Sequence, residues 1–226
     1  MAKIKAIVFD SNETLLDLAA LDPLLRRLFG ERRSREVWFG KVVEQFLAAT
    51  VIGRFRPFSE LADGALDLAA AQLGAPAPNK AERAAVHEAL LELPAHADVR
   101  PALERLRTTK LILAVMTNSG SAAVKAQFKA AGIDDLFDAV HAADAPACYK
   151  PHPEAYAYAA RQLGVDLDEV RLVAAHGWDV SGALAAGAQA AFVARPGKGL
   201  DPRAPAPDIT GQDLVDVAEQ IVREDG

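Results

Sequence analysis

The sequence is almost free of cysteine, with Cys148 as its single thiol among 226 residues. An internal disulfide needs two cysteines, so none can form, and we expect a reducing compartment. No apolar run reaches the length of about 20 residues that a membrane helix needs. The first ten residues, MAKIKAIVFD, lack the apolar stretch and cleavage site of a signal peptide. We therefore expect a cytoplasmic protein that does not span a membrane.

Metal-binding patterns and an excess of positive charge are also missing. The five histidines are scattered, without the spacing of a metal motif such as HExxH. The formal net charge is -6, which argues against binding to the phosphate backbone of nucleic acids. An apolar fraction of 51% and a charged fraction of 25% are those of an ordinary globular protein. Composition thus excludes several classes of ligand, and the chemistry has to come from the motifs.

Short apolar runs alternate with helical patterns over much of the chain. The runs that are typical of buried parallel strands cover residues 4–9, 111–116, 139–143, 170–175 and 188–194, and the run at 139–143 is the weakest. Helical patterns lie between them at residues 101–108, 121–131, 153–163 and 181–186. This alternation predicts an α/β fold with a Rossmann-like parallel sheet that is covered by helices on both faces.

A long segment after the first strand has a different pattern. Helix-period hydrophobicity without a clear strand covers residues 18–29, 34–50, 59–73 and 80–93. We therefore expect two domains: an α/β core of residues 1–16 and 96–226, and a helical cap of residues 17–95 inserted into it.

Polar side chains follow the ends of the predicted strands. They are Asp10, Ser11, Asn12 and Thr14, then Thr117, Asn118 and Ser119, then Lys150 in the loop after the weak strand, then His176 and Asp179. Each of them alone could be a helix cap or a solvated side chain. Parallel strands, however, bring their carboxyl ends to one edge of the sheet, where such folds bind ligands. The set therefore predicts a single site.

Four of these segments, in order, resemble the motifs of the haloacid dehalogenase superfamily. They are FDSNET at 9–14, TN at 117–118, YKP at 149–151 followed by Tyr156, and WD at 178–179. The helical insertion after the first motif resembles the cap of that superfamily. The Trp-Asp pair, the place of Tyr156 and the small cap are most similar to the type II (L-)2-haloacid dehalogenases. The resemblance implies a hydrolase acting on the carbon–halide bond of a small 2-haloalkanoic acid, and a homodimer.

The acid at the first strand end and the amide two residues later suggest the same chemistry. A carboxylate such as Asp10 can attack carbon or phosphorus and form a covalent ester. Superfamily phosphatases carry a second aspartate two residues later, which protonates the leaving group. Here that place is taken by Asn12, which has no proton to give at neutral pH. A halide leaves without a proton, so Asn12 favours displacement of a halide.

The resemblance also implies a role for each member of the site. Asp10 attacks the α-carbon and Thr14 hydrogen-bonds Asp10. Lys150 keeps Asp10 ionised, because a nearby ammonium lowers the pKa of a carboxyl group. Asp179 positions or deprotonates the water that hydrolyses the ester, and Tyr156 pairs with the Lys150–Asp179 group.

A second group of residues is expected to bind the substrate. It comprises Ser11, Asn12, Phe39, Thr117, Asn118, Tyr156 and Trp178. Thr117 and Asn118, with nearby backbone N–H groups, are expected to hold the substrate carboxylate. Trp38, Phe39 and Trp178 are expected to form an apolar wall over it, although aromatic residues at helical spacing also occur as plain core.

The sequence departs from the compared dehalogenases at several places. Asn12 and Glu13 stand where a tyrosine and a glycine are usual, and Phe39 stands where an arginine faces the leaving halide. In the last motif, Ala174 and His176 replace a serine and an asparagine. Three readings of His176 are open: a polar rim residue bonded to Asp179 or to a backbone carbonyl, a group that activates water, or a protonated donor to the halide.

No cofactor is expected, and no metal residue is assigned. Asp10 and Asp179 offer a single carboxylate pair, which could bind Mg²⁺ weakly at most. One alternative is a Mg²⁺-dependent phosphatase of the same fold acting on a small phosphate ester. Another is a catalytically silent relative that binds a small anion or a protein. The set of Asp10, Lys150 and Asp179 argues against a silent protein, because charges on one rim are costly to keep without a function.

Overall fold

The computed structural model describes residues 3–226, and their strands form one six-stranded parallel sheet in the order β3-β2-β1-β4-β5-β6. The strands are β1 (Ala6–Phe9), β2 (Ile112–Thr117), β3 (Ala139–Ala142), β4 (Val170–Ala174), β5 (Gln189–Val193) and β6 (Ile209–Gly211). The central strand β1 pairs with β2 and β4, so that Val8 lies beside Ala114 and Leu172. The predicted α/β class and parallel sheet are confirmed, whereas β6 was not predicted.

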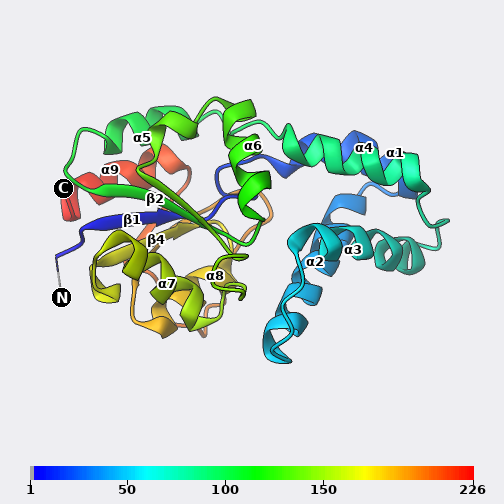
Figure 1. Ribbon diagram of the computed structural model, residues 1–226. Coiled ribbons are helices and arrows are strands. Elements are labelled where there is room, and N and C mark those ends of the chain that lie inside the picture. The colour runs from blue at the N-terminus through cyan, green and yellow to red at the C-terminus, as the bar shows by residue number, and fades with distance from the viewer. Residues whose placement is uncertain (1–2) are drawn as a thin grey trace.

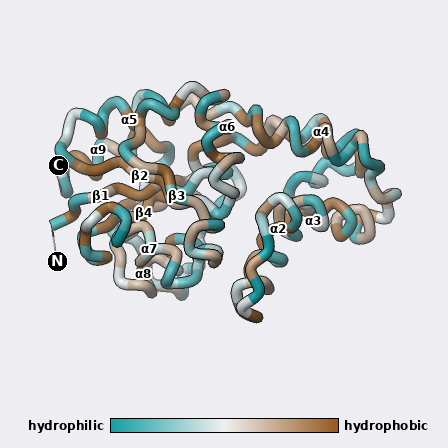
Figure 2. Tube along the Cα trace, in the orientation of Figure 1, coloured by the Kyte–Doolittle hydropathy of each residue, from teal (hydrophilic) through white to brown (hydrophobic). Residues whose placement is uncertain are grey.

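Helices cover both faces of the sheet. Figure 1 shows α5 (Val99–Leu106) and α9 (Leu214–Glu224) on one side, and α7 (Pro153–Leu163) and α8 (Gly177–Ala186) on the other. Alternate side chains of β1 pack on opposite faces of the sheet: Phe9 belongs to one buried hydrophobic cluster and Val8 to the other. The hydrophobic colour of the central strands in Figure 2 shows the same core. Burial on both faces explains why these strands form continuous apolar runs.

The predicted bounds of three helices that border the site can be compared with the structure. The helices α6 (Ser121–Ala131) and α7 have the predicted bounds, and both end at a glycine with positive φ, Gly132 and Gly164. The helix predicted at residues 181–186 begins earlier, at Gly177. Asp179 therefore lies in the first turn of α8 and is fully buried there. The single-turn helices η2 (Asp134–Leu136) and η3 (Leu167–Glu169) complete the connections.

The segment between β1 and α5 is helical, as predicted. It contains η1 (Leu18–Leu21), α1 (Asp22–Phe29), α2 (Ser34–Val51), α3 (Phe58–Leu73) and α4 (Lys80–Leu91), which extend from the sheet layer in Figure 1. Trp38 is buried between α2 and α3 and donates its indole N–H to the carbonyl oxygen of Ala62 at 3.0 Å.

The two chain segments that join these helices to the sheet run side by side. The N–H of Asp17 donates to the carbonyl of Pro94 at 2.8 Å, and the N–H of His96 to that of Leu15 at 2.9 Å. We propose that this crossing separates a core of residues 1–16 and 96–226 from a cap of residues 17–95. Among residues 3–226, no helix combines the length and the hydropathy that a membrane span needs.

Candidate active site

Asp10 follows β1 directly and is held by Thr14, which is itself fixed by the backbone after β4. Its carboxylate Oδ2 accepts a hydrogen bond of 2.7 Å from the hydroxyl of Thr14. That hydroxyl accepts one of 3.0 Å from the N–H of Ala175, just after β4. Asp10 is buried, with 5% of its surface exposed. The neighbouring parallel strands thus fix the orientation of the carboxylate.

Lys150 joins Asp10 to Asp179. Its ammonium Nζ lies 3.0 Å from Asp10 Oδ1 and 2.6 Å from Asp179 Oδ2, and the lysine is fully buried. The hydroxyl of Tyr156 donates to Asp179 Oδ1 at 2.6 Å. The structure therefore brings together the residues that the motifs grouped, and their catalytic roles stay proposals.

The charges of this cluster stabilise one another. Burial alone raises the pKa of the Asp10 carboxyl group, but Lys150, His176 and Thr14 outweigh it and hold that pKa well below its usual value. Burial lowers the pKa of the Lys150 ammonium, and the two carboxylates outweigh it and raise that pKa. Burial and the nearby Asp10 raise the pKa of Asp179. Asp10 is thus held ionised and can act as a nucleophile.

His176 bridges Asp10 and Glu13. Its ring Nδ1 lies 3.2 Å from Asp10 Oδ2, and its Nε2 lies 3.0 Å from Glu13 Oε2. The expectation that its ring bonds Asp179 or a backbone carbonyl is wrong, because both ring nitrogens face carboxylates. Burial lowers the pKa of His176, but the hydrogen bonds and charges of Asp10 and Glu13 raise it to about 9. The ring is therefore a cation at neutral pH.

The charge of His176 predicts a pH-dependent stability. A folded-state pKa of about 9 lies above the ordinary value of 6.5, so the contribution is fully present below pH 6.5 and is lost as the pH rises through 9. The free energy of unfolding of the wild type minus that of His176→Asn should fall over this window by roughly 3 kcal/mol. Urea unfolding at several pH values measures it. A difference that stays constant from pH 6 to 10 contradicts a charged His176.

The residues after Asp10 include two unpartnered buried polar atoms. Within residues 3–226, the Ser11 hydroxyl and Asn12 Oδ1 have no hydrogen-bond partner, although both side chains are buried. The amide nitrogen of Asn12 donates to the Ser119 hydroxyl at 3.1 Å. Buried polar atoms without a partner are rare, and a bound ligand is one explanation for them.

The two residues predicted to hold the substrate carboxylate already have partners in the protein. The hydroxyl of Thr117 accepts from the N–H of Ser119 at 3.1 Å. The amide of Asn118 makes two bonds to the backbone of Lys150: its Nδ2 donates to the Lys150 carbonyl at 3.0 Å, and its Oδ1 accepts from the Lys150 N–H at 2.9 Å. Asn118 therefore positions the lysine loop, and its contact with substrate stays a proposal.

The aromatic residues separate into two groups. The ring of Trp178 stacks on His176 with centroids 5.2 Å apart, and the ring of Phe39 lies 5.9 Å from His176. Both line a cavity of about 750 Å³ together with Glu13 and His176. Trp38 is fully buried and does not line this cavity, so it belongs to the core and not to the predicted wall.

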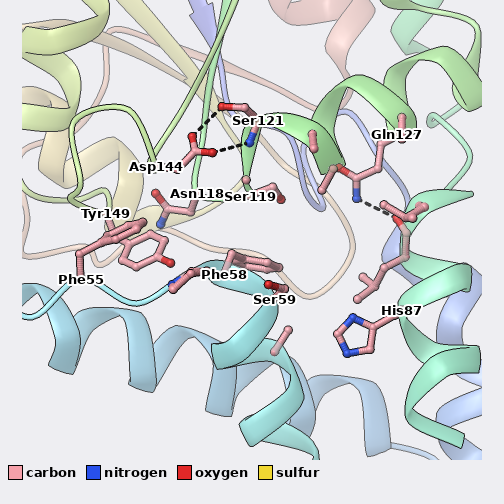
Figure 3. A pocket seen from close by; sticks show the side chains of 18 residues that line it. Phe55, Phe58, Ser59, His87, Asn118, Ser119, Ser121, Gln127, Asp144 and Tyr149 are labelled. Atoms are coloured by element: carbon pink, nitrogen blue, oxygen red, sulfur yellow. Dashed lines mark hydrogen bonds between the residues drawn. The ribbon is translucent and has the colours of Figure 1, made fainter. Parts of the chain in front are cut away.

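A second cavity, of about 530 Å³, lies where α3 and α4 face the start of α6 (Figure 3). Phe55, Phe58 and Tyr149 give it an apolar side, and Asn118 and Ser119 lie at its inner end. This second cavity thus reaches the chain segment after β2 that contacts Asn12, whereas the first cavity is lined by His176.

Three charged residues around His176 were missed from the sequence. Glu13 binds Arg35 Nη1 at 2.9 Å and also pairs with the Lys198 ammonium, which lies 5.9 Å from the centre of the Phe39 ring. Arg35 precedes Phe39 by four residues on α2, so a shared helix face was the available signal. For Glu13, the signal was its presence where the compared enzymes have glycine, and its φ is indeed positive, at 63°.

The site offers no arrangement that resembles a metal centre. In the part of the chain that the structure describes, no group of three His, Cys, Asp or Glu side chains is placed to hold a metal ion. The ammonium of Lys150 lies between Asp10 and Asp179, the pair that was considered for Mg²⁺.

A family model and several known proteins match this chain. A family model described as haloacid dehalogenase-like hydrolase matches residues 4–187. An (S)-2-haloacid dehalogenase of Xanthobacter autotrophicus is 33% identical over 85% of this chain and 76% of its own. Haloacetate dehalogenase H-2 of Moraxella sp. (strain B) is 29% identical over 93% and 94%. A solved structure of L-2-haloacid dehalogenase from Xanthobacter autotrophicus superimposes with a TM-score of 0.88 at 29% identity, covering 97% of this chain and 98% of that chain.

Proposed function

Since the chain belongs to the haloacid dehalogenase-like hydrolases, we propose that it hydrolyses the carbon–halide bond of a small 2-haloalkanoic acid. It acts as a hydrolase of the (S)-2-haloacid dehalogenase type, the activity named for several of its relatives. A related structure is described with chloropropionic acid covalently bound, which supports a covalent route here.

The observation that carries the proposal is the buried Asp10 carboxylate, paired with Lys150 and followed by an amide at position 12. Among the described residues, Asp10 Oδ2 accepts two hydrogen bonds, from Thr14 and His176, whereas Oδ1 accepts one, from Lys150. Oδ1 therefore keeps a lone pair for attack on the α-carbon of the substrate. Attack forms an ester to Asp10, and the halide leaves with the bonding electrons.

Water completes the cycle by attacking the carbonyl carbon of this ester. Asp179 is placed by Lys150 and Tyr156 to position the water or accept its proton. Cleavage returns the Asp10 carboxylate, the 2-hydroxyacid and one proton. The residues proposed to bind the substrate are those expected from the sequence: Ser11, Asn12, Phe39, Thr117, Asn118, Tyr156 and Trp178.

The contact of His176 with Asp10 bears on its role. Displacement at carbon places the leaving halide on the side of the α-carbon opposite to the attacking oxygen. The ring of His176 bonds the nucleophile itself, 3.2 Å from Asp10 Oδ2, so this geometry favours a role in ester hydrolysis over a role as halide donor. Arg35 and Lys198 are nearby cations, and both are engaged by Glu13.

The phosphatase alternative is less supported. In the superfamily phosphatases the leaving alkoxide is protonated by an acid two residues after the nucleophile, and Asn12 at that place cannot supply the proton. No cofactor is part of the proposed route, and weak binding of Mg²⁺ is not needed for it.

Halide release tests the proposal directly. The purified protein is incubated with chloroacetate and with each enantiomer of 2-chloropropionate in the presence of EDTA, and free chloride is measured. We expect chloride from chloroacetate and from the (S) enantiomer in preference to the (R) enantiomer. Hydrolysis of p-nitrophenyl phosphate that requires Mg²⁺, without chloride release from any of the three acids, supports the phosphatase instead.

The proposal extends to compartment and assembly. The single thiol, Cys148, fits the cytoplasm. We propose a homodimer through the helical segment, because Val51 and Ile52 at the end of α2 expose 85% and 66% of their surface, and Leu68 of α3 exposes 43%. Sedimentation of a monomer at micromolar concentration contradicts the dimer.

A further inference from the structure

The charged cluster of Glu13, Arg35 and Lys198, in which Glu13 contacts His176, has no role in the route described so far. We propose that Glu13 is a positioning residue that holds His176 as a hydrogen-bond donor to Asp10 Oδ2, so that the pair assists hydrolysis of the covalent ester rather than its formation. This inference rests on the proposed dehalogenation and deepens it.

The geometry ties Glu13 to His176 through a fixed set of contacts. Glu13 is 7% exposed, and Oε2 lies 3.0 Å from His176 Nε2. The same oxygen, Oε2, also accepts from the ammonium of Lys198, and the other oxygen, Oε1, accepts from Arg35 Nη1 at 2.9 Å. A positive φ of 63° is unfavourable for a residue with a long side chain, so this conformation is held by the surroundings. The His176 ring is further clamped by Trp178 and Phe39.

The position of the His176 nitrogen indicates the step that it serves. If Oδ1 of Asp10 attacks the substrate, Oδ2 becomes the carbonyl oxygen of the ester. Negative charge develops on this oxygen when water attacks the ester carbon. The hydroxyl of Thr14, at 2.7 Å, and Nδ1 of His176, at 3.2 Å, already point at Oδ2. Donors that are positioned before charge develops stabilise the transition state, which is how an oxyanion hole acts.

Glu13 is needed because formation of the ester removes a charge. In the free enzyme, the two carboxylates of Asp10 and Glu13 face His176, and Arg35, Lys198 and Lys150 lie one contact further away. Once Asp10 is an ester, Glu13 is the remaining carboxylate in contact with the ring. Burial raises the pKa of Glu13, but its hydrogen bond to His176 and the charge of Lys198 outweigh it and lower that pKa to about 2. Glu13 thus stays ionised and keeps the ring protonated and oriented through the second step.

The test is the kinetics of Glu13→Gln with (S)-2-chloropropionate. We expect kcat to fall on the order of 10²-fold, the loss typical of one removed oxyanion donor. The ratio kcat/KM should stay within about threefold of the wild type, because it reports the steps up to halide departure. Rapid mixing should show a burst of chloride equal to the enzyme concentration, and mass spectrometry of quenched enzyme should show the ester on Asp10.

Matched variants separate positioning from damage to the fold. Glu13→Asp keeps the carboxylate and tolerates positive φ, so it should recover part of kcat. Asp225→Asn removes another buried carboxylate, the one that pairs with Arg171 at 2.6 Å, and should leave kcat and the burst amplitude as they are in the wild type. In a His176→Ala background, Glu13→Gln should cause no further loss of kcat, because Glu13 acts only through His176.

If the wild type releases chloride, two results for Glu13→Gln overturn the inference and leave the proposed function intact. One is a fall of kcat and kcat/KM by the same factor. The other is an unchanged kcat without a burst. Absence of chloride release from the wild type instead contradicts the proposed function itself. A Glu13→Gln protein that does not fold is replaced by Glu13→Asp, for which full loss of activity without a burst also overturns the inference.

Discussion

A single turnover in ¹⁸O-labelled water should leave the heavy oxygen in the protein and not in the 2-hydroxyacid. In the proposed route, water attacks the carbonyl carbon of the Asp10 ester, so the oxygen of water enters the Asp10 carboxylate. The hydroxyl oxygen of the product comes from Asp10 itself. Mass spectrometry of the peptide that contains Asp10 should therefore show a gain of one heavy oxygen. Label in the product of the first turnover contradicts the covalent route.

Replacement of the same residue should have the largest effect on activity. We expect Asp10→Asn to lower kcat by at least roughly 10⁴-fold, in line with the loss of nucleophiles in other covalent hydrolases. The asparagine amide is close in shape to the aspartate carboxylate, so we expect the variant to stay folded and to lose activity only. Asp225→Asn serves as the control, since it removes a buried carboxylate far along the chain from the motifs. Residual chloride release above a few per cent in Asp10→Asn excludes Asp10 as the nucleophile.

Lys150→Met should cause the second largest effect, on both activity and stability. The fully buried ammonium of Lys150 lies between two buried carboxylates, 3.0 Å from Asp10 and 2.6 Å from Asp179. Removal of one partner of a buried ion pair typically costs about 3–5 kcal/mol, because a buried charge is left uncompensated. Urea unfolding near neutral pH should show a loss of this size. Activity should fall on the order of 10²-fold or more, because the nucleophile loses its main counterion.

The pH dependence of this variant provides its own control. In the wild type, the lowered pKa of Asp10 means that its stabilising contribution is present above the unfolded pKa near 3.8 and is lost as the pH falls through the folded value. In Lys150→Met, the unpaired carboxyl groups take up protons more readily, so the deficit should shrink as the pH falls from 7 toward 4. Lys5→Met, which breaks the exposed pair with Glu169, should change stability far less, because solvent screens an exposed ion pair. A Lys150→Met deficit no larger than that of Lys5→Met excludes a central role for the buried pair.

The sequence predicted the features that depend on local pattern and on strand direction. Asp10, Lys150 and Asp179 come from distant segments, and they could be grouped because parallel strands share one edge of the sheet. Strand β6 escaped prediction because it has only three residues, of which Thr210 is exposed, so no apolar run marks it. The early start of α8 was missed because Gly177 and Trp178 were read as loop.

The cluster around His176 could not be predicted in the same way. Its partner Glu13 has a positive φ of 63°, which the sequence pattern does not reveal. Arg35 comes from α2, and Lys198 comes from the loop after β5, so three segments with no sequence pattern in common meet at one carboxylate. Contacts of this kind depend on tertiary packing and not on periodicity. The sequence marked Glu13 and His176 as unusual, and only the structure placed them in contact.

The paired connections between the helical segment and the sheet have a consequence for how such a protein can be altered. Leu16 and Ala95 form an isolated antiparallel bridge, so the two ends of residues 17–95 leave the sheet next to each other. A segment whose ends adjoin can be exchanged for one of different length without moving β1 or α5, the elements on either side of it. The junction at Leu16 and Ala95 is therefore modular. The residues at the strand ends stay in place, and the inserted helical segment can be redesigned to admit other substrates.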